Sequence, residues 1–133
     1  MKTSNHAAHS LTYHIVLTTK YRRRCIDSQM LARLRELFAR TCEAWRCELV
    51  EFSGEADHVH LLVAEQPSMN LSHFVANLKT VSSRKIRQEF AGRLARYYWK
   101  NVFWNSAYAV VSAGGHASIE QLVAYIQNQE TPR

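Results

Sequence analysis

The stretch Asp57-His58-Val59-His60-Leu61-Leu62-Val63 decides the fold and holds the first candidate functional residues. Its apolar residues predict a β-strand, in which side chains alternate between two faces. His58 and His60 therefore share one face, and the alternate aliphatic residues share the other. Two imidazoles on one face can supply two ligands to a metal ion, although His-x-His alone is a weak motif and a strand histidine is more often a core residue. A metal-dependent site would still need a third ligand and a nucleophile.

Both missing groups can come from residues 118–129, near the C-terminus. Ser118 and Gln121 form a capping box, and apolar residues then recur at helical spacing, which predicts a helix. Tyr125 and Gln129 are four residues apart and lie one turn from each other on the flank of the apolar stripe. Such a helix can bring a phenol and an amide oxygen to the histidine face. Taken alone, the same pair would be a tyrosine packed at a helix edge beside a solvated glutamine.

The remaining segments complete an α+β pattern. Strands are predicted at residues 11–18, 48–53, 57–63 and 108–113, and helices at about 28–45, 70–90 and from 118 onward. This order matches a split βαβ, ferredoxin-like antiparallel sheet with helices on one face and the histidines on the open face. The C-terminal helix is additional to that plan. The aromatic residues 97–104 predict an extended excursion at the sheet edge, where core packing of Trp104 is favoured over stacking on DNA.

Length and composition predict one domain spanning residues 1–133, with 1–9 as a mobile polar arm. No run approaches the roughly 18 apolar residues that span a bilayer, and no signal-peptide pattern precedes the first strand, so we expect a cytoplasmic protein. Cys25, Cys42 and Cys47 are odd in number and lack the paired spacing of metal ligands. They predict reduced thiols rather than a disulfide framework.

The formal charge of +6 and the sequence pI near 9.5 predict a polyanionic partner, and net charge alone would also allow a membrane surface. Clustering favours nucleic acid, because cations alternate with aromatic and hydroxyl side chains that can stack on unpaired bases and bind phosphates. The candidate DNA-binding residues form two groups, Lys20, Tyr21, Arg22 and Arg23, and Lys79, Ser82, Ser83, Arg84 and Arg87.

These motifs carry a family resemblance. The His58-Val59-His60 pair followed by Leu-Leu-Val, together with Tyr125-x-x-x-Gln129, resembles the HUH single-tyrosine transposases, the TnpA-type enzymes that move insertion sequences as single-stranded DNA. The likeness extends over nearly the whole chain, through residues 13–23, 78–84, 103–104 and 110–115. It implies single-stranded DNA with hairpin ends as substrate, and a homodimer in which the terminal helix brings its tyrosine to the partner's histidines.

The chemistry that follows is a hypothesis. His58, His60 and Gln129 would hold one divalent cation, Mg²⁺ or Mn²⁺ as in the resembled family, with positions left open for a phosphodiester oxygen. Tyr125 would attack phosphorus, giving a 5′-phosphotyrosine and a free 3′ hydroxyl. Because this bond conserves the energy of the phosphodiester, rejoining needs no nucleotide cofactor, and no Walker-type loop is present.

Two other classes of function remain open from the sequence. The chain could be a metal-dependent phosphodiesterase in which water attacks instead of Tyr125. It could also be a noncatalytic protein that binds DNA hairpins and retains the fold. The resemblance further includes relatives that act on dispersed genomic repeats, and the sequence leaves open which of these groups the chain joins.

Overall fold

The computed structural model describes residues 11–65, 68–114 and 117–129. Its elements, in chain order, are β1 (Leu11–Thr19), a 3₁₀ turn η1 (Lys20–Arg22), α2 (Ser28–Ala44), β2 (Glu48–Glu55), β3 (His58–Glu65), α3 (Leu71–Glu89), α4 (Ala91–Leu94), β4 (Trp104–Ser112) and α5 (Ile119–Gln129). The predicted order of strands and long helices is confirmed. The predicted mobile arm at residues 1–9 lies outside the described residues, as do Gly115 and His116.

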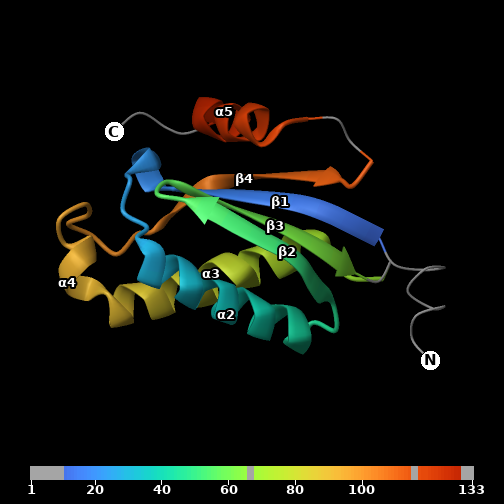
Figure 1. The fold of residues 1–133 in the computed structure, drawn as a ribbon, viewed down its shortest axis with the longest axis horizontal. Helices are drawn as coiled ribbons and strands as arrows, with labels where there is room; N and C mark the ends of the chain where they lie inside the picture. The colour runs from blue at the N-terminus through green and yellow to red at the C-terminus, as the bar shows by residue number, and fades with distance from the viewer. Residues whose placement is uncertain (1–10, 66–67, 115–116, 130–133) are drawn as a thin grey trace.

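The strands form one antiparallel sheet in the order β2-β3-β1-β4. The two central strands carry the longest apolar runs, and Ile15, Leu17, Leu61 and Val63 are fully buried on one face. Helices α2 and α3 cover that face and complete the main core (Figure 1). The ferredoxin-like α+β fold is therefore confirmed.

The helix ends follow local signals in the sequence. Asp27 accepts a hydrogen bond from the Met30 amide and caps α2, and Asn70 accepts one from the His73 amide and caps α3. At α5, the Gln121 amide donates to the Ser118 hydroxyl at 3.1 Å, and the Ser118 amide donates to the Gln121 side chain at 2.8 Å. This reciprocal pair is the predicted capping box.

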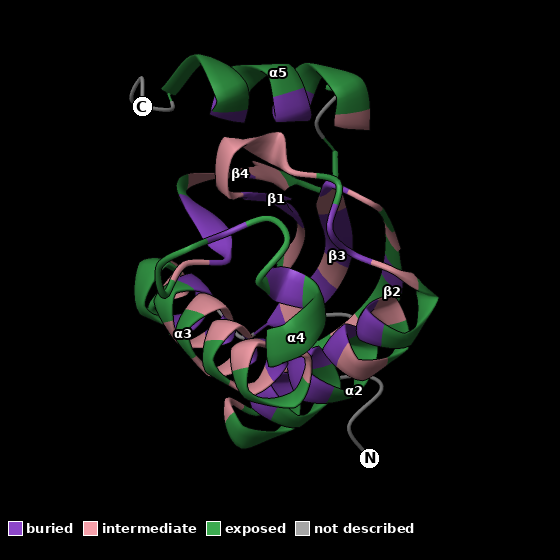
Figure 2. Cartoon of the chain, turned by 90° about the vertical axis from the view of Figure 1, so that its left-hand side faces the viewer, coloured by how far each residue is buried: buried purple, intermediate pink, exposed green. Residues whose placement is uncertain are grey.

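Helix α5 lies on the opposite face of the sheet, over β4 and β1 (Figures 1 and 2). It is held there by a small separate cluster of buried apolar side chains, Val16, Ala109, Leu122, Val123 and Ile126. The sequence predicted that this face would be open. That expectation is wrong for its β1–β4 half, because the apolar stripe of α5 finds a matching apolar strip on these two strands.

The aromatic segment differs most from its prediction. β4 begins at Trp104, earlier than the predicted residue 108, and the short helix α4 was not predicted. Trp104 is 7% exposed, packs edge-on against Phe103, and donates from its indole to the Ser82 hydroxyl at 2.9 Å. The preference for core packing over DNA stacking at this tryptophan is confirmed.

All three cysteines are free thiols, as predicted. Within the described ranges, no helix has both the length and the apolar character needed to cross a membrane.

Candidate active site

The two histidines lie on one face of β3, as the alternation predicts. In the sheet register, His58 is opposite Thr18 and His60 is opposite Val16 on β1. Val59, Leu61 and Val63 on the other face are fully buried in the main core. The imidazoles therefore face the side of the sheet on which α5 lies.

A carboxylate fixes the orientation of His58. The Nδ1 atom of His58 lies 2.9 Å from Oδ1 of Asp57, and Asp57 itself is only 5% exposed. Burial alone would raise the pKa of the Asp57 carboxyl, but hydrogen bonds from His58 and Arg22 outweigh burial and hold that pKa below its usual value. With Nδ1–H donated to the carboxylate, Nε2 of His58 keeps its lone pair for another partner.

Arg22 connects this pair to α5. Its guanidinium donates to Oδ2 of Asp57 at 2.8 and 3.2 Å, and to the Gln127 side-chain oxygen at 2.9 Å. The sequence predicted a DNA contact for Arg22. In the structure its guanidinium already joins the β2–β3 turn to the terminal helix.

His60 is more enclosed and makes a different contact. It is 7% exposed, and its Nε2 lies 2.8 Å from Nδ1 of His14, with the two rings stacked. Burial lowers the pKa of His60, and the neighbouring His14 lowers it further. The lowered pKa favours the neutral imidazole, which is the form that binds a metal. The interpretation of His14 as a strand residue that makes a hydrogen bond is confirmed.

A pocket of about 380 Å³ opens beside His58, between the β2–β3 hairpin and α5. The pocket is lined by basic, acidic and apolar side chains. The lining residues are Arg22, Ser53, Gly54, Glu55, His58, Ile119, Glu120, Val123 and Ala124. The two elements enclose a space with a histidine, an arginine and carboxylates at its edge. His58 is therefore accessible from this pocket.

Tyr125 and Gln129 lie on the other side of α5. Glu120 and Ala124 line the pocket, and Gln127 bonds to Arg22, so these three positions define the flank of α5 that faces the histidines. By helical spacing, Tyr125 and Gln129 fall on the opposite flank, with the buried stripe between. Tyr125 is 54% exposed, and Gln129 is exposed as well. The chain does not bring its own tyrosine to its own histidines.

His58 and His60 are the two residues of the described part of the chain that would hold a divalent cation, because imidazole nitrogens are common metal ligands. His58 presents Nε2 with its other nitrogen tied to a carboxylate, an arrangement typical of metal-binding histidines. The Nε2 atom of His60 lies 2.8 Å from Nδ1 of His14, so this contact would have to break for Nε2 to bind a metal. No group of three His, Cys, Asp or Glu residues in the described part of the chain could hold a metal ion. Gln129, the predicted third ligand, lies on the flank of α5 opposite the one that faces the histidines, so the structure does not bring it to them.

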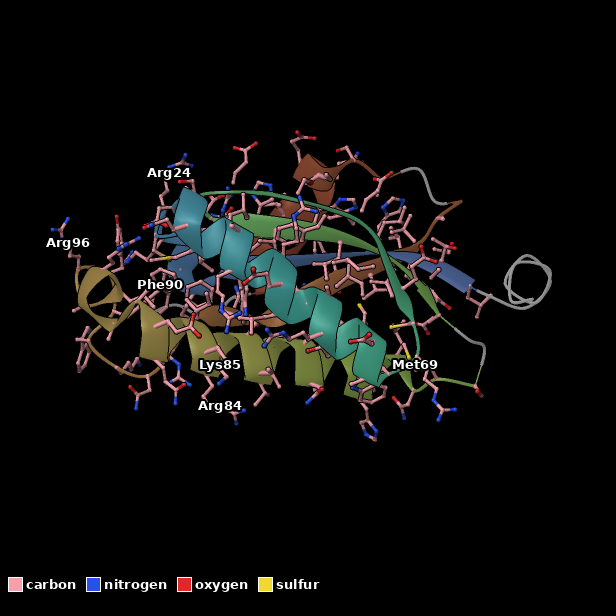
Figure 3. All side chains as sticks on the ribbon, turned by 60° about the horizontal axis from the view of Figure 1, so that its bottom comes forward. Arg24, Met69, Arg84, Lys85, Phe90 and Arg96 are labelled. Carbon is pink, nitrogen blue, oxygen red and sulfur yellow. The ribbon has the colours of Figure 1, made fainter. Side chains whose placement is uncertain are left out.

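Apart from Arg22, which bonds to Asp57 and Gln127, the predicted DNA-binding residues divide into three groups. Ser82 is fully buried and donates to the Leu78 carbonyl, a position that does not fit a DNA contact. Arg84 extends from the outer side of α3, away from the sheet (Figure 3). The others lie where η1 and the C-terminal half of α3 approach residues 97–104, namely Lys20, Tyr21, Arg23, Lys79, Ser83 and Arg87.

Two residues of the site were missed by the sequence reading. Glu120 lines the pocket and Gln127 anchors Arg22, yet neither belongs to a motif. The helical spacing of residues 120, 124 and 127 was the available signal, since it marks one flank of α5. Asp57 carried a clearer signal, because a carboxylate next to a histidine can orient it.

A His-x-His strand in a four-stranded antiparallel sheet, with a tyrosine on an added terminal helix, defines the class of single-tyrosine HUH transposases. The chain belongs to the family described as Transposase IS200 like, which it matches over residues 7–129. The predicted resemblance is thereby confirmed.

Individual relatives agree with this assignment. The chain is 30% identical over 128 residues to the transposase for insertion sequence element IS200 of Salmonella typhimurium, covering 96% of this chain and 82% of the relative. It is 25% identical over 129 residues to the ISDra2 transposase TnpA of Deinococcus radiodurans, covering 97% and 91%.

Solved structures extend the similarity to the fold. A crystal structure of a protein assigned as a transposase, from Deinococcus radiodurans R1, superposes with a TM-score of 0.77 at 28% identity and covers 93% of this chain and 94% of that chain. The REP-associated tyrosine transposase bound to a REP hairpin superposes with a TM-score of 0.58 at 12% identity, over 89% of this chain and 63% of that one. The second likeness concerns the fold alone.

Proposed function

We propose that this transposase cleaves and rejoins single-stranded DNA at hairpin-bearing ends, as a cytoplasmic homodimer with Tyr125 as nucleophile. The observation that carries the proposal is the division of α5 into two flanks. One flank closes the pocket beside His58, and the other presents Tyr125 and Gln129 to solvent. A tyrosine turned away from its own histidines is suited to serve the histidines of a second copy.

In this proposal each site is composite. His58 and His60 come from one copy, and Tyr125 and Gln129 come from the α5 of the other. A divalent cation, Mg²⁺ or Mn²⁺, would bind an oxygen of the scissile phosphodiester there and neutralise charge that builds on it. The proposed ligands are His58, His60 and Gln129. Asp57 keeps His58 in the tautomer that offers Nε2.

The chemical step is a transfer of the phosphodiester to Tyr125. The phenol loses its proton and its oxygen bonds to phosphorus, while the bond from phosphorus to the 3′ oxygen breaks. The departing 3′ oxygen takes up a proton, and the 5′ end stays linked to Tyr125. Because an ordinary phenol has a pKa near 10, positive charge at the composite site is needed to favour the phenolate.

The first experiment detects the covalent intermediate. End-labelled single-stranded DNA carrying an element end is incubated with the protein and Mn²⁺, and adducts are resolved on denaturing gels. We expect an adduct that both Tyr125→Phe and His58→Ala abolish. Cleavage that survives in Tyr125→Phe would replace the proposal with the water-dependent phosphodiesterase. DNA binding without cleavage by the wild type, unchanged by chelator, would replace it with the noncatalytic hairpin binder.

Mixing the two inactive variants tests the composite site. Random pairing of His58→Ala with Tyr125→Phe subunits makes half of the dimers mixed, and each mixed dimer has one intact composite site. We therefore expect about one quarter of the wild-type adduct yield from the mixture and none from either variant alone. A mixture as inactive as its components would assign Tyr125 to its own subunit's histidines.

A further inference from the structure

A groove lies along residues 97–104, with walls from η1, α3 and α4. Helix α4 marks this end of the molecule in Figure 1. The groove consists of three adjoining pockets of about 190, 430 and 300 Å³, and Val102 lines all of them. Neighbouring pockets share further walls, Trp99 and Lys100 between the first two and Arg87 and Asn101 between the last two. We name this feature the Val102 groove.

The charge of the Val102 groove has one sign. Arg23, Lys100, Arg87 and Lys79 follow one another along its length. Among the residues described by the structure, no Asp or Glu lines any of its three pockets. A groove with several cations and no compensating acid attracts a linear polyanion.

The end of the groove nearest η1 is aromatic. Tyr21, Tyr97, Tyr98 and Trp99 line its pocket of about 190 Å³. Trp99 is 91% exposed, the highest exposure among the large apolar side chains of the described residues, and Lys100 Nζ lies 5.7 Å from its ring. This pocket is smaller than the roughly 300 Å³ at which drug-sized ligand sites begin, and it suits one planar ring.

The wall behind Trp99 is fixed. Tyr98 is 8% exposed and donates from its hydroxyl to the Lys20 carbonyl at 2.6 Å. The Lys20 amide donates to the Phe103 carbonyl at 2.8 Å, which joins η1 to the far side of the groove. A ring entering the pocket therefore meets a preformed surface and orders little more than the Trp99 side chain.

We propose that the Val102 groove binds unpaired nucleotides of single-stranded DNA, with one base stacked on Trp99 and the following phosphates along Lys100, Arg87 and Lys79. This inference rests on the proposed single-stranded DNA substrate. Stacking on an exposed aromatic ring beside a basic track binds any base, because every base has a π-face. Paired bases cannot enter a pocket for one ring, so the groove selects an unpaired flank over a duplex stem.

The test uses fluorescence anisotropy in metal-free buffer, so that no cleavage occurs. The probes are a labelled oligo(dT) of about 20 nucleotides, a DNA hairpin with a dT flank, and the same hairpin with blunt ends. We expect Trp99→Ala to weaken oligo(dT) and flanked-hairpin binding by about fivefold or more, with Trp99→Phe recovering part of the loss. Blunt-hairpin binding should stay unchanged. Intrinsic tryptophan fluorescence should fall on oligo(dT) binding in the wild type and not in Trp99→Ala.

Charge variants test the phosphate track. Lys100→Ala should weaken oligo(dT) binding and reduce the slope of log affinity against log salt by about 0.7, the value for one phosphate contact on a single strand. Arg40→Ala, which removes an exposed charge on α2, is the matched control and should leave the slope as in the wild type. The inference is overturned if Trp99→Ala binds oligo(dT) like the wild type, or if it weakens the blunt hairpin equally.

The two proposals can fail separately. One outcome is that Trp99→Ala weakens oligo(dT) binding while the wild type forms no covalent adduct. This outcome would support single-stranded DNA binding in the Val102 groove and refute Tyr125 as nucleophile. The opposite outcome is an adduct that depends on Tyr125 together with wild-type oligo(dT) affinity in Trp99→Ala. It would support Tyr125 as nucleophile and refute DNA binding in the Val102 groove.

Discussion

Replacing Asp57 with asparagine tests whether the buried carboxylate prepares His58 for its role. Asp57 accepts from His58 Nδ1 at 2.9 Å and from Arg22 at 2.8 and 3.2 Å, and Arg24 lies 3.8 Å away. An asparagine side chain at this position has nearly the same shape but no charge, and its amide nitrogen cannot accept a hydrogen bond. Asp57→Asn should therefore loosen the His58 ring and the Arg22 link without leaving a cavity.

Two magnitudes follow from these contacts. Losing a carboxylate that orients a metal-binding histidine costs about 10- to 100-fold in metal affinity or activity. For stability, breaking a buried ion pair costs roughly 3–5 kcal/mol, but the Arg22 side chain is 33% exposed, so we expect only about 1–2 kcal/mol. The pKa of Asp57 is lowered in the folded state, so its ion pair stabilises the fold above the unfolded pKa of about 3.9. This stabilisation is lost as the pH falls through the folded pKa.

The assays are the rate of adduct formation, isothermal titration with Mn²⁺, and urea denaturation at several pH values. Glu48→Gln, an exposed carboxylate at the other end of β2, is the matched control and should behave as the wild type. The stability difference between Asp57→Asn and the wild type should shrink in acid. A variant with wild-type Mn²⁺ affinity and adduct rate would refute the orienting role of Asp57.

Three other perturbations have defined outcomes. Trp104→Ala removes a 7% exposed indole and leaves the Ser82 hydroxyl without its donor. Urea denaturation should therefore show a free energy of unfolding lower by about 3–5 kcal/mol. Wild-type stability in this variant would contradict the place of Trp104 in the core. Burial raises the pKa of Glu65 to about 7, so the wild type loses stability as the pH rises from its unfolded pKa through 7. Glu65→Gln should be more stable than the wild type at about pH 8, by up to about 3 kcal/mol, and equal to it at about pH 4. Ser118→Ala removes half of the capping box and should cost about 1 kcal/mol, seen as faster amide exchange confined to α5.

The fold was predictable because its signals are local. Asp27, Asn70 and Ser118 each stand one residue before a helix and accept the amide hydrogen bond that begins it. The alternation around His58 and His60 fixed the face of β3 because one face of that strand is fully apolar. Each of these features depends on residues within a few positions in the chain.

The aromatic segment was less predictable because its environment is built from distant parts of the chain. Trp104 begins β4 opposite Thr19, beyond an irregularity in the β1–β4 register. Its indole bonds to Ser82 on α3, which is 22 residues away. Trp99 and Trp104 are both tryptophans in one aromatic run, yet one is 91% exposed and the other 7%. Hydrophobicity alone assigns both to the core.

The orientation of α5 could be predicted only in part from its helical pattern. The stripe of Leu122, Val123 and Ile126 fixes which side of α5 is buried, and therefore predicts that Tyr125 lies on a flank. It does not fix which flank faces the histidines, because that depends on the direction in which α5 crosses β1 and β4. In the structure, the flank with Glu120 and Ala124 takes that place, and Arg22 secures it through Gln127. The exposed Tyr125 flank is consequently available to a second copy, which makes the complementation of His58→Ala by Tyr125→Phe the most discriminating test of the proposed site.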